Sequence, residues 1–261
     1  MDFTESQIHR YARHILLREV GGVGQEKLLK SKVLVIGAGG LGSPLILYLA
    51  AAGVGTIGVI DDDKVDLSNL QRQIAHTTAR IGMAKVASAA QAVADINPDV
   101  EVIEHRERLG LDNIMALIAD YDVIADGSDN FPTRFLVNDA CYFAKKTLVS
   151  AAVLRFDGQL ATFKPHAGGP CYRCLYPEPP PPGQIPSCDE AGVMGAVAGV
   201  MGTLQATEVL KELLGIGESM AGRLMVYDAL AATTRHVKVN PDPECPLCSP
   251  KATIKKLQLS R

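Results

Sequence analysis

Residues 32–42 read KVLVIGAGGLG, an aliphatic run that passes directly into a cluster of glycines. The run favours a short buried strand, and the residues from Leu41 onwards have the composition of a helix. Gly37, Gly39 and Gly42 fit the pattern G-x-G-x-x-G between the two, where backbone amides can approach a phosphate at the helix N-terminus. The stretch therefore predicts a Rossmann-like nucleotide-binding unit. The alternative is a tight turn that binds no ligand.

The alternation of short strands and helices continues along the chain. Further strands are expected over residues 56–60, 100–103 and 121–125, and helices over residues 5–18, 41–52, 83–96, 131–145 and 189–214. Such alternation implies a mostly parallel sheet covered by helices on both faces. Three later runs, residues 159–163, 223–227 and 234–239, favour antiparallel strands that extend this sheet. The expected fold class is therefore α/β and Rossmann-like.

One globular unit is expected over residues 1–261. Its parts are a helical arm over residues 1–30, a nucleotide-binding half over 31–150, and a C-terminal segment over 151–261. The sequence PEPPPPGQIP at residues 177–186 cannot form a helix or a central strand, because prolines lack amide donors. It predicts a crossover loop that serves either as a linker or as a flap over a site.

Composition excludes several classes of partner. A formal charge of -3 over 261 residues gives no broad cationic surface for a nucleic acid. The N-terminus lacks the apolar core of a secretory signal, and the most apolar stretch, residues 193–204, is too short and too interrupted by glycine to cross a membrane. Four of the six cysteines form two Cys-x-x-Cys pairs, which suits a reducing compartment. We therefore expect a cytoplasmic protein.

Acidic residues follow the second expected strand. Asp61 is placed where a carboxylate would accept hydrogen bonds from ribose hydroxyls, a position that suits NAD and ATP equally. Asp62 and Asp63 are compatible with solvated loop charges, and that interpretation is favoured for Asp62. The glycine turn and Asp61 together predict a nucleotide without choosing between these two.

Two cations and a further carboxylate favour ATP. Arg72 and Lys85 lie near the glycine turn, and nucleotidyl transfer is catalysed largely by positioning and by neutralising charge on phosphate oxygens. Each alone would be interpreted as an exposed charge. Asp129 follows the strand at residues 121–125, where it can hold Mg²⁺ against the phosphates. Alternatively, Asp129 or Asn130 caps the helix that follows.

The two Cys-x-x-Cys pairs predict a structural zinc site. Together they supply the four thiolates of a tetrahedral centre, with no position open for chemistry: Cys171, Cys174, Cys245 and Cys248. Such a site would tether the C-terminal tail to the crossover region. Disulfide formation and redox use are the alternatives.

The remaining cysteines are interpreted differently. Cys141 lies in an apolar helical stretch and is expected to pack. Cys188 stands at the start of an expected helix, where the helix dipole favours a thiolate, so it is a candidate nucleophile. Chance exposure near a helix start is the competing interpretation.

Several motifs occur in a fixed order. They are Tyr11-x-Arg13-His14, GAGGLG at residues 37–42, SNLQRQ at residues 68–73, Lys85, Ser128-Asp129-Asn130 and the two Cys-x-x-Cys pairs. In this combination, over nearly the whole chain, the sequence resembles the HesA/MoeB/ThiF adenylyltransferases, bacterial relatives of the ubiquitin-activating enzymes. The resulting candidate ATP site comprises Gly37, Gly39, Gly40, Gly42, Asp61, Ser68, Asn69, Leu70, Gln71, Arg72, Lys85, Asp129, Asn130 and, from a neighbouring subunit of a homodimer, Arg13.

The resemblance also implies a reaction. The terminal glycine carboxylate of a small ubiquitin-like sulfur-carrier protein would attack Mg·ATP, releasing pyrophosphate, and a separate donor protein would supply sulfur. Within the family the sequence is most similar to the molybdopterin-synthase type, MoeB-like, partly through residues 188–193, CDEAGV. The alternative is the thiamine-pathway type, ThiF-like. By the same resemblance, Cys188 is a position that can join covalently to the carrier in some relatives and is dispensable in others.

Two hypotheses from other classes compete. The glycine turn and Asp61 would also suit an NAD-dependent oxidoreductase, but that leaves Arg72, Lys85 and the cysteine pairs unexplained. A zinc-stabilised binding module that docks a small protein without turning over nucleotide is the second alternative.

Overall fold

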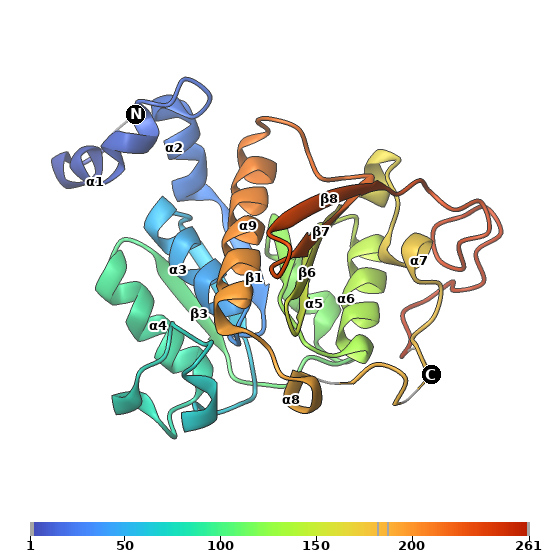
Figure 1. Cartoon of the computed structure of the whole chain (residues 1–261). Helices are drawn as coiled ribbons and strands as arrows, with labels where there is room; N and C mark the ends of the chain where they lie inside the picture. Colours follow the sequence, from blue (N-terminus) through green and yellow to red (C-terminus); the bar gives the residue numbers. More distant parts are fainter. Residues whose placement is uncertain (1–2, 182, 187, 260–261) are drawn as a thin grey trace.

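An eight-stranded sheet forms the centre of the protein (Figure 1). The computed structural model describes residues 3–181, 183–186 and 188–259. The strand order is β3-β2-β1-β4-β5-β6-β7-β8. The pairs from β3 to β5 are parallel, and those from β5 to β8 are antiparallel. The expected fold class, a Rossmann-like parallel sheet extended by antiparallel strands, is confirmed.

The elements have the following bounds. The strands are β1 Lys32–Ile36, β2 Thr56–Ile60, β3 Glu101–His105, β4 Val123–Asp126, β5 Thr147–Leu154, β6 Asp157–Phe163, β7 Arg223–Asp228 and β8 Thr233–Lys238. The α-helices are α1 Glu5–Ile15, α2 Gly21–Lys30, α3 Gly42–Ala52, α4 Lys85–Ile96, α5 Ile114–Ala119, α6 Phe131–Ala144, α7 Tyr172–Leu175, α8 Cys188–Ala191 and α9 Gly195–Leu214. Short 3-10 helices are η1 Leu67–Asn69, η2 Thr78–Arg80 and η3 Pro165–Ala167. Residues 177–181 and 183–186 form neither helix nor strand, as expected.

The sequence patterns missed one central element and misplaced the start of another. Strand β5 was not predicted, although it joins the parallel and antiparallel parts of the sheet. The expected continuous helix over residues 189–214 is interrupted at residues 192–194. Gly192 adopts φ 77°, and the Met194 amide donates to the Arg155 carbonyl at 3.0 Å. This connection interrupts the helix, so α8 ends at Ala191 and α9 begins at Gly195.

Helices cover both faces of the sheet. One buried cluster joins the sheet to α3, α4 and α9, and a second joins its other face to α5 and α6. The N-terminal arm of α1 and α2 projects beside α3 (Figure 1). Its buried Tyr11 hydroxyl accepts a hydrogen bond from Asn97 Nδ2 at 2.9 Å. No helix in the described part of the chain is long and apolar enough to span a bilayer.

Helix α9 packs closely on α3 and on the glycine turn, and a glycine permits this approach. A Cβ atom at Gly202 would lie 2.4 Å from the Leu41 carbonyl oxygen and 2.5 Å from Pro44 Cγ. At Gly199, one turn earlier, a Cβ atom would meet no described atom within 4 Å. The close packing of α9 therefore requires glycine at position 202 but not at position 199.

This difference predicts opposite effects of alanine. Gly202→Ala should lower the free energy of unfolding by about 1–3 kcal/mol, because the new methyl group has no space. Gly199→Ala should raise it by roughly 0.5–1 kcal/mol, because glycine in a helix interior carries an entropic penalty. Urea denaturation of both variants measures the difference, and equal effects would contradict the close approach.

Candidate nucleotide-binding site

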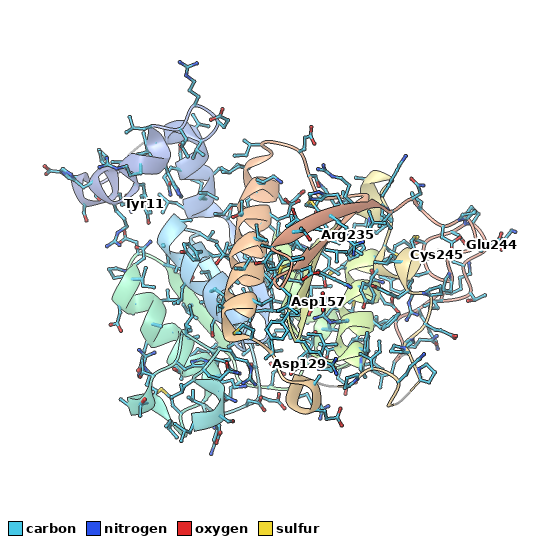
Figure 2. All side chains as sticks on the ribbon, in the orientation of Figure 1. Tyr11, Asp129, Asp157, Arg235, Glu244 and Cys245 are labelled. Atoms are coloured by element: carbon cyan, nitrogen blue, oxygen red, sulfur yellow. The ribbon has the colours of Figure 1, made fainter. Side chains whose placement is uncertain are left out.

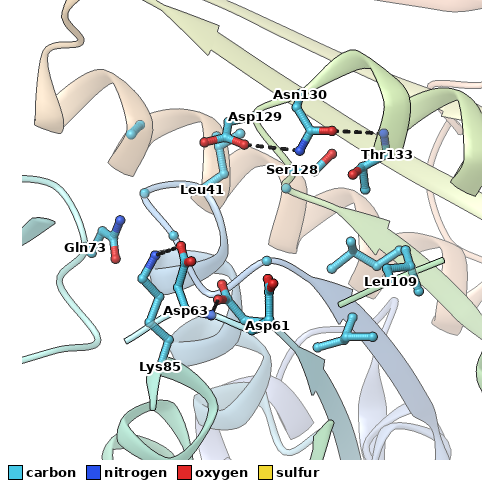
Figure 3. Close-up of a pocket in the computed structure, with 18 of the residues that line it drawn as sticks. Leu41, Asp61, Asp63, Gln73, Lys85, Leu109, Ser128, Asp129, Asn130 and Thr133 are labelled. Carbon is cyan, nitrogen blue, oxygen red and sulfur yellow. Dashed lines mark hydrogen bonds and ion pairs between the residues drawn. The ribbon is translucent and has the colours of Figure 1, made fainter. Parts of the chain in front are cut away.

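A cleft of about 380 Å³ opens at the carboxyl ends of β1, β2 and β4 (Figure 3). Strand β1 lies between β2 and β4, so the chain leaves β1 for one side of the sheet and later returns to the other. Open α/β sheets bind ligands at such a switch point. Eight predicted site residues line the cleft: Gly37, Gly39, Gly40, Asp61, Arg72, Lys85, Asp129 and Asn130.

The glycine turn forms the floor of the cleft, and its closure requires glycine. Gly37 adopts φ 89°. A Cβ atom at Gly42 would lie 1.9 Å from the Gly37 carbonyl oxygen, so no side chain fits there. Gly42 therefore shapes the turn and is not among the described residues that line the cleft.

Two polar side chains form hydrogen bonds with the backbone of this turn. Asp61 Oδ2 accepts a hydrogen bond from the Ala38 amide at 2.8 Å, and His76 Nε2 lies 2.9 Å from the Ala38 carbonyl. Burial lowers the pKa of His76, which favours the neutral ring at pH 7. Asp61 thus has a structural role in addition to the predicted contact with ribose.

The predicted cations form one wall. Lys85 is 6% exposed, and its Nζ lies 2.8 Å from Asp63 Oδ2. Arg72 lies beside the glycine turn, with Cγ 3.4 Å from the position of a Cβ on Gly40, and Nη1 donates to the Ser68 carbonyl. Both cations therefore line the cleft beside the glycine turn.

The residues before Arg72 shape its loop. Ser68, Asn69, Leu70 and Gln71 are outside the set of described residues that line the cleft. The amides of Arg72 and Gln73 donate to the Asn69 carbonyl at 3.0 and 2.9 Å. In the described structure, this segment presents Arg72 to the cleft and does not itself border it.

The opposite wall carries Asp129 and Asn130. The Asn130 side chain caps α6 by accepting the Thr133 amide at 3.0 Å, which is the capping role anticipated for this segment. Asp129 is exposed at the cleft, and Asn130 Nδ2 donates to its Oδ1 at 3.4 Å. The carboxylate therefore retains oxygen atoms that face the cleft (Figure 3).

A buried ion-paired network beneath this wall was not predicted. Arg134 donates to the Ala151 carbonyl at 2.8 Å and to the Ser128 carbonyl, and it lies 3.5 Å from Asp126 Oδ2. Ser128 Oγ in turn donates to Asp126 Oδ1 at 2.6 Å. This network fixes the loop that carries Asp129. No sequence pattern marks Arg134, because its partners come from β4, from the loop after β4 and from β5.

Four further residues that line the cleft were not predicted as site residues: Asp63, Gln73, Arg108 and Leu109. Gln73 is 4% exposed, and its Oε1 has no hydrogen-bond partner among the described residues. Asp63 pairs with Lys85 and lines the cleft. Arg108 and Leu109, beyond the end of β3, add a cation and an apolar contact. The SNLQRQ motif pointed to Gln73, whereas nothing in the sequence marked the loop after β3.

Arg13 is a further predicted residue that is outside the described lining of the cleft. Arg13 lies on α1, and Figure 2 shows Tyr11 of this helix far from Asp129. Cys188 begins α8, but its side chain lies outside the described residues. The structure therefore leaves the predicted roles of both residues as proposals.

The four cysteines of the two Cys-x-x-Cys motifs lie together in one cluster. Their sulfur atoms lie within 4.8 Å of one another, with separations of 3.9 Å for Cys171–Cys174, 3.6 Å for Cys171–Cys245 and 3.3 Å for Cys174–Cys248. Tetrahedral zinc with Zn–S bonds of ~2.3 Å places sulfurs roughly 3.8 Å apart. The cluster can therefore hold zinc, and it lies away from Asp129 (Figure 2).

Comparisons with known proteins identify relatives along nearly the whole chain. The ThiF family matches residues 11–247. A sulfur carrier protein adenylyltransferase of Thermus thermophilus is 48% identical, over 98% of this chain and 96% of its own. A SAMP-activating enzyme E1 of Haloferax volcanii is 49% identical, over 95% and 91%. An adenylyltransferase and sulfurtransferase MOCS3 of Anopheles gambiae is 47% identical over 97% of this chain, which spans 58% of that protein.

Solved structures support the same fold at lower sequence similarity. The structure of E. coli MccB with AMPCPP and MccA aligns with a TM-score of 0.80 and 21% identity, covering 92% of this chain and 74% of MccB. From the family match and the relatives near half identity, we conclude that the chain belongs to the ThiF family and is an adenylyltransferase.

Proposed function

We propose that the protein adenylates the C-terminal glycine carboxylate of a small ubiquitin-like sulfur-carrier protein. The observation that carries this proposal is the convergence of the glycine turn, Arg72, Lys85 and Asp129 on one cleft. The Thermus relative, named as acting on a sulfur carrier, supports the choice of substrate. The chain is an adenylyltransferase, so neither the dehydrogenase nor the non-catalytic binding module describes it.

The proposed reaction forms an acyl adenylate. A carboxylate oxygen attacks the α-phosphorus of ATP, the bond to the bridging oxygen breaks, and pyrophosphate leaves with that electron pair. Arg72 and Lys85 neutralise the charge that builds on the phosphate oxygens, while the glycine turn positions the nucleotide. No general base is needed, because a carboxylate is already ionised at pH 7.

Asp129 fits the role of a magnesium ligand. Its carboxylate faces the cleft, and Mg²⁺ prefers oxygen ligands shared with substrate phosphates. The ion would supply charge neutralisation at those phosphates. Asp126, by contrast, accepts hydrogen bonds from Ser128 and Ser150, so it supports the loop from below.

Within this activity, we favour the carrier of molybdenum cofactor biosynthesis over the thiamine-pathway carrier. The support is the similarity to the MoeB type, including the CDEAGV stretch at residues 188–193. A separate protein would donate the sulfur that converts the adenylate into a thiocarboxylate. Cys188, which follows the proline-rich stretch, is proposed as the residue that can join covalently to the carrier. Its thiolate would attack the acyl adenylate to form a thioester, and AMP would leave with the electron pair of the broken acyl–oxygen bond.

We also propose a homodimer that completes each cleft. Arg13 is exposed on α1 and is outside the described lining of its own cleft. The same residue on a second copy can therefore serve as a third cation for the triphosphate. The four cysteines are proposed to bind structural zinc, since their sulfur separations suit a tetrahedral centre.

The first prediction concerns the cleft. Arg72→Ala and Asp129→Ala should each lower carrier-dependent exchange of labelled pyrophosphate into ATP by about 10²–10³-fold, because each removes charge stabilisation at the reacting phosphates. Each purified carrier is tested separately. The proposed pathway requires faster exchange with the molybdopterin-synthase carrier.

Asp120→Ala serves as the matched control. This exposed carboxylate lies before the start of β4, whereas the cleft opens at the carboxyl ends of the strands. It should leave exchange unchanged. If Arg72→Ala exchanged pyrophosphate at the wild-type rate, the cleft would be excluded as the site of the reaction. Faster pyrophosphate exchange with the thiamine-pathway carrier than with the molybdopterin-synthase carrier would reverse only the choice of pathway.

The second prediction concerns Arg13. Arg13→Ala and Asp129→Ala chains should each be nearly inactive alone, but mixing them with subunit exchange should restore about a quarter of wild-type activity, because half of the dimers then hold one complete site. A mixture that stays inactive, despite mixed dimers seen by native mass spectrometry, would show that Arg13 does not act across the interface.

The third prediction concerns the cysteine cluster. Cys174→Ser should lower the zinc content and lower Tm by on the order of 5–10 °C, because a site of four thiolates loses a ligand. Cys141→Ala is the control. Burial raises the pKa of the Cys141 thiol, and this residue packs within α6 outside the cluster. Elemental analysis should therefore find unchanged zinc in that variant.

A further inference from the structure

Lys85 is bound to the segment that follows β2 by both its backbone and its side chain. The Lys85 amide donates to the Asp63 carbonyl at 3.0 Å, and Lys85 Nζ donates to Asp63 Oδ2 at 2.8 Å. The next pair of residues, Lys64 and Ala84, forms an isolated antiparallel bridge. Figure 3 shows the ammonium directed at the Asp63 carboxylate within the cleft. Asp63 is thus paired with Lys85, the cation that would bind the triphosphate in the proposed reaction.

The two members of this ion pair differ strongly in burial. The Lys85 side chain is 8% exposed, whereas that of Asp63 is 67% exposed. A buried ammonium without a partner loses its hydration and gains nothing in return, so it requires a counter-charge. An exposed carboxylate is readily hydrated when released, so Asp63 can leave the pair at little cost.

The surrounding charges favour release of Asp63 when phosphate enters. The carboxylates of Asp61, Asp62 and Asp63 lie within 4.8 Å of one another. Asp61 is fixed by the amides of Ala38 and Asp63, so its position is set. Phosphate oxygens near Lys85 would repel the Asp63 carboxylate and replace it as the counter-charge.

We propose that Asp63 is a positioning residue that competes with the nucleotide for Lys85. It keeps the ammonium paired and directed into the cleft when no phosphate is present. It is displaced when ATP binds, and it pairs with Lys85 again as pyrophosphate leaves. Asp63 therefore weakens the binding of ATP and pyrophosphate, which favours release of the product. The inference rests on the proposed function, since it assumes that phosphates occupy this part of the cleft.

The test is the affinity of the intact protein for nucleotide. Isothermal titration calorimetry with Mg·ATP, and separately with magnesium pyrophosphate, should show about fivefold tighter binding to Asp63→Asn, corresponding to roughly 1 kcal/mol for a partly exposed ion pair. Damage to the fold would weaken binding, so tighter binding cannot come from a merely structural effect. Unchanged or weaker binding by Asp63→Asn overturns the proposal.

Asp62→Asn is the matched control, because it removes the same charge from the neighbouring cleft residue. It should change the affinity less than twofold on account of screening at an exposed site. Equal tightening by both variants would reduce the effect to general electrostatics and overturn the specific competition with Lys85.

A double-mutant cycle isolates the role of Lys85. In a Lys85→Gln background, Asp63→Asn should no longer tighten binding, since the group for which Asp63 competes is gone. Persistent tightening overturns the inference. Failure of the wild-type protein to bind Mg·ATP would instead overturn the proposed function. Carrier-dependent exchange by the wild type with no tightening in Asp63→Asn would overturn only the competition.

Discussion

The closure of the glycine turn between Gly37 and Gly42 is the constraint on which the cleft depends. Any side chain at Gly42 would collide with the Gly37 carbonyl, and the turn places the first residues of α3 directly behind the cleft floor. Asp61, directly after β2, and His76, in the loop after η1, hold the turn through hydrogen bonds to Ala38. Helix α9 can approach it because Gly202 has no side chain. A rigid floor results, and the charged residues are arranged around it.

The cations Arg72 and Lys85 and the carboxylate of Asp129 lie on opposite walls of the cleft. Arg72 comes from the connection between β2 and α4 and Lys85 is the first residue of α4, whereas Asp129 comes from the loop between β4 and α6. Each wall has its own support, from Asp63 for Lys85 and from the Arg134 network for the loop that carries Asp129. This separation gives a polyphosphate both a cationic side and a carboxylate able to hold its metal.

Helix α6 links the cleft to the cysteine cluster. It begins at the cleft with its Asn130 cap, and further along its length Asp139 forms a buried two-point ion pair with Arg173. Arg173 lies between two cysteines of the cluster and also donates to the Pro177 carbonyl, where the proline-rich stretch begins. Arg173 thus connects the start of this stretch to α6 through hydrogen bonds.

Local patterns and short spacings in the amino-acid sequence were enough to predict strands β1 to β4, the glycine turn, both Cys-x-x-Cys pairs and eight residues of the cleft lining. The folded structure was needed for the place of β5, the break before α9, the pairing of Lys85 with Asp63 and the buried position of Arg134. These features arise from contacts between distant segments, and such contacts leave no periodicity in a single sequence. The packing of the N-terminal arm likewise keeps α1, which carries Arg13, away from the cleft, with Tyr11 of this helix far from Asp129 in Figure 2.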